Sequence, residues 1–119
     1  MKKSDFVRIG ILTQPINSAV PSKNHKNPDQ YILDINRYFI ELSGFAKAVP
    51  LRYDLISDES VLNATLDSLD GVLFTGGFLS LRVYKHAPES VKVFYETAKY
   101  IFKYALANML PILGICQGF

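Results

Sequence analysis

The sequence is poor in features that would identify a class of protein at once. Its 119 residues include a single cysteine, Cys116, so no disulfide can form within the chain. No stretch approaches the roughly 20 consecutive apolar residues of a membrane span. The net charge of +2 is too small to favour nucleic acid or an anionic membrane as a partner. Asp5 and Arg8 interrupt the segment after Lys2 and Lys3, so we expect no signal peptide and a cytoplasmic location.

What the sequence does contain is an alternation of short apolar runs with segments of helical periodicity. Apolar runs predict strands at residues 6–12, 45–51, 71–75 and 111–115. Helical spacing predicts helices that begin at residues 27–30, 57–58 and 88–90. This order predicts an α/β fold with a doubly wound, mostly parallel, flavodoxin-like sheet and helices on both faces. With about four strands and three helices, the sheet would be incomplete.

The start of the first helix carries the clearest local signals. Asn27 can cap, Pro28 suits the first helical position, and Gln30 sits where a capping-box partner belongs. Gly44 is a natural end. The residues predicted to face the core are Ile32, Ile35, Phe39 and Leu42.

Cys116 lies between two glycines, directly after the last predicted strand. Gly114-Ile-Cys-Gln-Gly118 has the form of a nucleophile elbow, a tight turn at which side chains on the flanking residues would clash. The amides of a following helix would lower the pKa of the thiol. The competing interpretation is an ordinary packed thiol, since free cysteine is among the most buried residue types.

Two further groups would meet Cys116 at the carboxyl ends of the parallel strands. The backbone N–H of Gln117 would point into an oxyanion hole. The pair Gly76-Gly77 ends the neighbouring strand and could supply a second donor, because glycine lets bare backbone approach a substrate carbonyl.

Several segments, in order, carry a resemblance to a known family. They are IGILTQP (9–15), YILDINRYFIELSG (31–44), LDGVLFTGG (69–77) with LR (81–82), and PILGICQGF (111–119). Together they resemble the gamma-glutamyl hydrolases, the folate-polyglutamate branch (peptidase family C26) of the class I glutamine amidotransferase-like superfamily. The resemblance implies that residues 1–119 are the N-terminal part of a single hydrolase domain.

The resemblance also implies a chemistry. Cys116 would be the nucleophile, the backbone of Gly77 and Gln117 the oxyanion donors, and Gly76 and Arg82 substrate contacts. The thiol would attack a gamma-glutamyl amide of a small-molecule substrate, a folyl-polyglutamate, and water would hydrolyse the glutamyl thioester. No metal, organic cofactor, nucleic acid or membrane is implied.

The chain departs from the family pattern in three places. Thr75 stands where the family commonly has proline. Asn36, followed by Arg37-Tyr38, stands where the family carries a tyrosine toward the cleft. The family's catalytic histidine, with a glutamate two residues on, follows the elbow, and neither His25 nor His86 matches that pattern.

These departures bear on activity and location. We expect little or no hydrolase activity from this chain alone, which would need a missing C-terminal half or a homodimer partner. Members of the family are lysosomal, vacuolar or secreted, in contrast to the location expected above.

Three alternatives remain open at this stage. One is a non-catalytic remnant that binds a partner or a glutamyl ligand. Another is a glutamine amidotransferase subunit that feeds ammonia to a synthase. The last is an α/β-hydrolase with cysteine in place of serine, which the elbow by itself does not exclude.

Overall fold

The computed structural model describes residues 6–15, 30–76 and 89–115. The strands in these ranges are β1 (Arg8–Leu12), β2 (Gln14–Pro15), β3 (Gln30–Tyr31), β4 (Lys47–Leu51), β5 (Gly71–Phe74) and β6 (Ile112–Gly114). The helical segments are α1 (Asp34–Tyr38), the π-helix η1 (Phe39–Ser43), the 3-10 helix η2 (Leu55–Ser57), α2 (Glu59–Asp67) and α3 (Glu89–Asn108).

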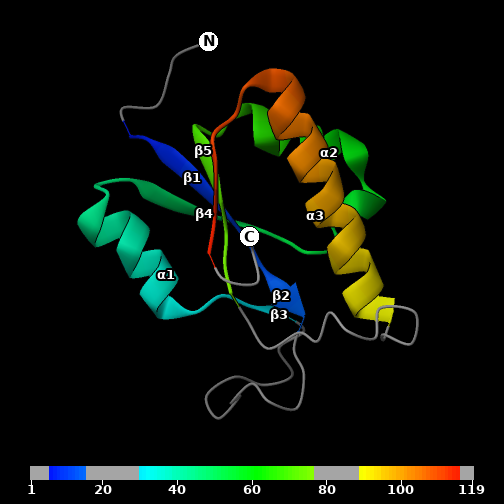
Figure 1. Cartoon of the computed structure of the whole chain (residues 1–119), viewed down its shortest axis with the longest axis horizontal. Coiled ribbons are helices and arrows are strands. Elements are labelled where there is room, and N and C mark those ends of the chain that lie inside the picture. The colour runs from blue at the N-terminus through cyan, green and yellow to red at the C-terminus, as the bar shows by residue number, and fades with distance from the viewer. Residues whose placement is uncertain (1–5, 16–29, 77–88, 116–119) are drawn as a thin grey trace.

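Four of the strands form one parallel sheet in the order β4–β1–β5–β6 (Figure 1). Gly10 in the central strand β1 lies opposite Val49 of β4 on one side and Val72 of β5 on the other. Leu73 of β5 lies opposite Leu113 of β6. The chain therefore leaves β1 toward one edge and then crosses to the other side. This confirms the predicted doubly wound α/β fold.

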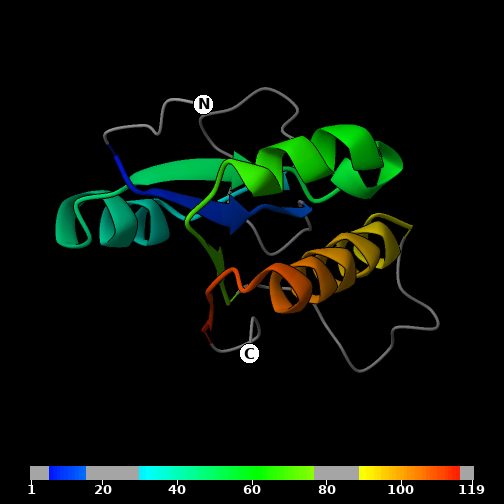
Figure 2. The same ribbon diagram turned by 90° about the horizontal axis from the view of Figure 1, so that it is seen from above.

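Apolar side chains alternate between the two faces of this sheet and bury a separate cluster on each. One cluster joins the sheet to α2 and α3; its buried members are Leu12, Leu51, Leu62, Leu66, Leu69, Val72 and Ile101. The other joins the sheet to η1 and contains Ile11, Ile40 and Leu73. Figure 2 shows α1 on one side of the sheet and α2 and α3 on the other. Helices thus cover both faces, as predicted.

The first helix begins later than the sequence predicted. Residues 27–29 lie outside the described ranges, but Gln30 and Tyr31 form β3, which pairs antiparallel with β2. The helix starts only at Asp34, after Leu33, and no side chain caps it. The prediction of a helix start that includes Gln30 is therefore wrong. Strand pairing and the side-chain contacts of Gln30, described below, outweigh the local capping signal.

The predicted core face of this helix is also wrong. Ile35 is 72% exposed, Phe39 51% and Leu42 69%, whereas Ile40 is buried at 4%. Of the four residues predicted to face the core, only Ile32 packs, in part, against the cluster of Ile11, Ile40 and Leu73. The inward positions are instead Ile32, Asn36 and Ile40, one every four residues. From Phe39 onward the π-helix η1 has a wider turn, which departs further from the 3.6-residue periodicity on which the prediction relied.

The helix ends at Gly44, as predicted, and the reason is steric. Gly44 has an ordinary φ of −94°, and a Cβ there would lie 2.8 Å from the carbonyl oxygen of Ile40. The next residue, Phe45, takes the left-handed conformation with φ 52°. Residues other than glycine rarely adopt this backbone conformation, so the turn into β4 carries backbone strain.

The other two helices form where the sequence predicted them. Asp58 caps α2, because its carboxylate accepts a hydrogen bond from the backbone N–H of Val61 at 3.2 Å. In α3 the buried stripe is narrower than the apolar pattern of its sequence, since Phe102 and Leu106, which belong to that pattern, are 49% and 67% exposed. No helix in the described ranges is long and apolar enough to cross a membrane.

Candidate functional site

The carboxyl ends of β1 and β5 meet at the point where the chain reverses its direction of winding. Ligands of open α/β sheets bind outside this point, because the loops that follow the two strands separate there. Residues after β1 begin at Thr13, and residues after β5 begin at Thr75. Thr13 and Gln14 are buried polar residues, at 4% and 3% exposure. A polar cluster in this position identifies the candidate site.

Gln14 connects the two strand ends. Its side-chain Nε2 donates to the carbonyl oxygen of Gly76 at 3.0 Å, and it lies 3.4 Å from both the carbonyl oxygen and Oγ1 of Thr75. Its Oε1 accepts a hydrogen bond from the Tyr31 hydroxyl at 3.2 Å. Both ends of the amide are therefore satisfied, as a buried polar group requires.

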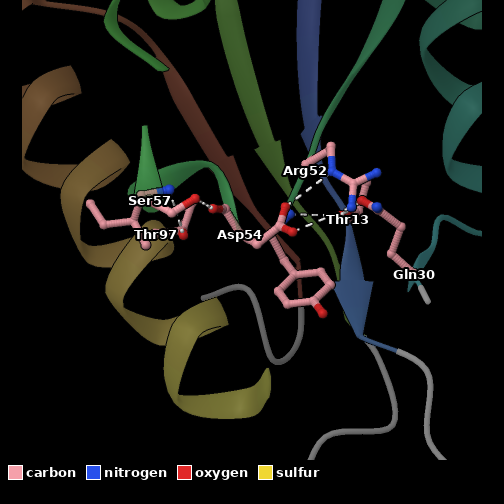
Figure 3. Close-up of polar contacts among 8 residues, drawn as sticks. Thr13, Gln30, Arg52, Asp54, Ser57 and Thr97 are labelled. Carbon is pink, nitrogen blue, oxygen red and sulfur yellow. Dashed lines mark hydrogen bonds and ion pairs between the residues drawn. The ribbon is translucent and has the colours of Figure 1, made fainter. Parts of the chain in front are cut away.

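A second group of contacts surrounds Thr13 (Figure 3). Its Oγ1 accepts from the backbone N–H of Tyr53 at 2.9 Å and lies 2.7 Å from the side-chain amide of Gln30. The Gln30 amide oxygen faces Arg52, at 2.6 Å from Nη1 and 2.8 Å from Nη2, because a guanidinium can only donate. Arg52 also pairs with Asp54, with Nε 3.1 Å from Oδ1.

These contacts join the segments that follow β1 and β4 to the strand β3. Thr13 follows β1, Arg52 follows β4, and Gln30 belongs to β3. The Arg52–Asp54 pair is about half exposed, at 52% and 41% of the side chains, so its electrostatic contribution to stability is small. The pair acts on the site by positioning, because the guanidinium that Asp54 orients also holds the Gln30 side chain next to the end of β1.

The structure places one of the predicted site residues in this cluster. Gly76 follows Thr75 in the segment after β5, and its carbonyl accepts a hydrogen bond from Gln14. Gly77, Arg82, Cys116 and Gln117 lie outside the described residues, as do His25 and His86.

The strands that lead to these residues are in contact. Ile115 donates its backbone N–H to the carbonyl oxygen of Phe74 at 2.9 Å. The described chain therefore brings the segments that precede Cys116 and Gly77 to the same edge of the sheet.

The first helix gives no polar contact toward this edge among the described residues. Asn36 is half-buried, and Arg37 pairs on the surface of its own helix with Asp34 at 3.7 Å and Glu41 at 3.6 Å. The Arg37 guanidinium lies 5.0 Å from the ring centroid of Tyr38. Its hydrogen bond with Tyr38, and secondarily the two carboxylates, raise the pKa of Arg37 above its ordinary value.

A metal site does not form within the described part of the chain, where no three His, Cys, Asp or Glu side chains come close enough to hold an ion. Sequence reasoning missed Thr13, Gln14, Gln30 and Tyr31. The available signal was a pair of polar residues, Thr13-Gln14, directly after an apolar strand. That position becomes informative only when the strand is known to be central.

Comparison with known proteins shows a family match along most of the chain. The chain matches the peptidase C26 family over residues 8–119. It is 33% identical to "Gamma-glutamyl hydrolase 1" of Arabidopsis thaliana in an alignment 116 residues long, which covers 93% of this chain and 30% of that protein. The chain therefore spans about a third of the length of this relative. Because the family match extends over nearly all of its residues, the chain belongs to the peptidase C26 family.

Proposed function

We propose that residues 1–119 are the N-terminal part of one hydrolase domain that cleaves gamma-glutamyl bonds with Cys116 as nucleophile. The observation that carries the proposal is the family match. The matched residues include the carboxyl ends of β1 and β5 and the Gly-x-Cys-x-Gly segment. The junction of β1, β5 and β6 supports it. The substrate class is a small molecule with gamma-linked glutamates, of which a folyl-polyglutamate is the example we propose.

The proposed reaction has two steps. The Cys116 thiolate attacks the gamma-carbonyl carbon, and the backbone N–H groups of Gly77 and Gln117 stabilise the oxyanion. The C–N bond then breaks, the leaving amine takes up a proton, and a glutamyl thioester remains on the sulfur. Water adds to the thioester and releases the carboxylate and the thiol. Gly76 and Arg82 are proposed to contact the substrate.

The protons of this cycle need a base and an acid. The proposal places the histidine and glutamate that move them outside the 119 residues, and gives His25 and His86 no such role. The isolated chain is therefore expected to undergo one acylation by an activated ester, which needs no acid for its leaving group, but to show little or no turnover of an amide.

An activated gamma-glutamyl aryl ester tests the proposal. Intact-mass spectrometry should show one glutamyl group added to the chain, and none added to Cys116→Ala. The matched control reagent is the alpha-linked glutamyl ester with the same leaving group, which should react more slowly. Equal rates with both esters, or equal labelling of the Cys116→Ala variant, would contradict the proposal.

Competition separates this function from that of a glutamine amidotransferase subunit. A gamma-glutamyl peptide should protect Cys116 from the ester at a lower concentration than free glutamine does. The reverse order of protection would favour the amidotransferase.

A further inference from the structure

We propose that Gln14 is a positioning residue for the oxyanion site. Its side-chain amide holds the carbonyl of Gly76, and thereby sets the direction of the N–H in the same peptide group. The inference rests on the proposed function, which assigns that N–H, of Gly77, to the oxyanion. Gln14 itself touches neither the substrate nor the reacting atoms in this proposal.

The side chain of Gln14 is buried. At 3% exposure its amide has lost nearly all contact with water, which costs free energy unless each polar atom is paired. The nitrogen is paired with Gly76 and the oxygen with the Tyr31 hydroxyl. Because Tyr31 donates to the oxygen, the –NH₂ group is the end that faces the segment after β5.

The geometry of a peptide group links its oxygen to its N–H. In a planar trans peptide, the C=O and the N–H point in opposite directions. A donor that fixes the Gly76 oxygen on the side of Gln14 therefore directs the N–H of that group to the opposite side. At 3.0 Å, this bond is shorter than the 3.4 Å contacts of the same nitrogen with Thr75, so it is the contact that defines this orientation.

Neither Gly76 nor Gly77 has a side chain. A peptide group between two glycines has few steric limits on its rotation, because neither residue carries a Cβ. An oxyanion donor must be held in place before the reaction to be effective. Gln14 supplies from β2 the restraint that the glycine pair cannot supply for itself.

The test compares two reactions of the single cysteine in the full chain. Acylation by the gamma-glutamyl aryl ester passes through an oxyanion, whereas alkylation by iodoacetamide does not. Gln14→Met keeps the length of the side chain and removes the hydrogen bonds. We expect it to slow acylation about 10-fold or more, since loss of a whole oxyanion donor costs roughly 10²–10³, and to leave the alkylation rate unchanged.

Two further variants keep the test decisive if Gln14→Met folds poorly. Tyr31→Phe removes only the hydroxyl that orients the Gln14 amide, and should lower the acylation-to-alkylation ratio by a smaller factor. In Gln14→Glu the protonated carboxyl can donate to Gly76, but the ionised form cannot. Its ratio should therefore approach that of the unmodified chain as pH falls; the thiolate fraction cancels because both reactions need it.

The outcomes separate the two proposals. If the unmodified chain is acylated no faster than free cysteine by the gamma-glutamyl ester, the proposed function fails and this inference fails with it. If the chain is acylated faster but Gln14→Met or Tyr31→Phe leaves the ratio unchanged, the function stands and Gln14 is not a positioning residue. Equal slowing of both reactions would also overturn the inference, because it would indicate general disruption.

Discussion

Gly10 lies where β1 passes close to the side chains of the larger core cluster. A Cβ at this position would lie 2.7 Å from Leu69 Cδ1 and 2.8 Å from Leu51 Cδ1. Both leucines are buried, at 7% and 0% exposure, so neither can move aside freely. Gly10 is thus required by the space between strand and core.

Gly10→Ala is expected to lower the free energy of unfolding by about 1–3 kcal/mol, the usual cost of overpacking a core. Gly71→Ala is the matched control, because Gly71 is in the next strand and its nearest contact would be Ile9 Cδ1 at 3.2 Å. It should cost less than about 1 kcal/mol, since alanine also restricts the unfolded chain. Urea denaturation of both variants checks this, and equal losses would contradict the explanation.

At the scale of single residues, a role can be proposed from a local pattern, but a contact between distant segments cannot. Cys116 could be proposed as a nucleophile from its flanking glycines and the strand before it. Gln14 could not be found, because its role depends on Gly76, which is distant in sequence and reaches it only through the pairing of β1 with β5. Such a contact leaves no local pattern.

The helix α2 shows how a single cap supports a short element. It has nine residues, and the Asp58 carboxylate satisfies the N–H of Val61 at its first turn. At its other end lies Asp67, an exposed acidic residue at the negative end of the helix dipole. The two aspartates therefore have opposite effects on the same helix.

Asp58→Ala is expected to reduce the free energy of unfolding by about 0.5–2 kcal/mol, the range for loss of an N-cap. The control Asp67→Ala removes the same charge at the unfavourable end, and should be neutral or slightly stabilising. Thermal denaturation followed by circular dichroism measures both. A loss in Asp67→Ala as large as that in Asp58→Ala would show that net charge, and not capping, is responsible.

At the scale of elements, the four strands of the parallel sheet and the helices α2 and α3 could be predicted, while the β2–β3 pair was missed and the first helix was not placed correctly. The signals for α2 are local, since the cap Asp58 and the buried leucines Leu62 and Leu66 lie within one segment. Those for α1 depend on β3, which pairs with a distant strand, and on the π-turn that brings Ile40 to the core. Neither a pairing across a loop nor a change of helical pitch is encoded in apolar spacing.

On the face that carries α1, the molecule has an apolar groove of about 400 Å³ between η1 and the strands β5 and β6. Among the residues that line it are Ile9, Phe39, Ile40 and Leu73, together with Leu113, which is 51% exposed. Exposed apolar surface of this kind binds hydrophobic dyes.

The groove predicts that the native chain increases the fluorescence of anilinonaphthalene sulfonate. Phe39→Ser should reduce this increase about twofold, because it removes one wall of the apolar patch. Phe102→Ser is the control, since Phe102 on α3 is equally exposed, at 49%, and does not line the groove. Equal effects of the two substitutions would mean that the dye reports exposed aromatics in general.

At the scale of the whole molecule, the strand order has a consequence for synthesis on the ribosome. Of the described strands, β1 is made before the others, yet its partners in the sheet follow about 40 residues later in β4 and about 60 residues later in β5. Contacts so distant in sequence form slowly. The central strand therefore spends the longest time exposed during translation, and any factor that protects nascent chains should be needed from the emergence of β1 until β5 has left the exit tunnel.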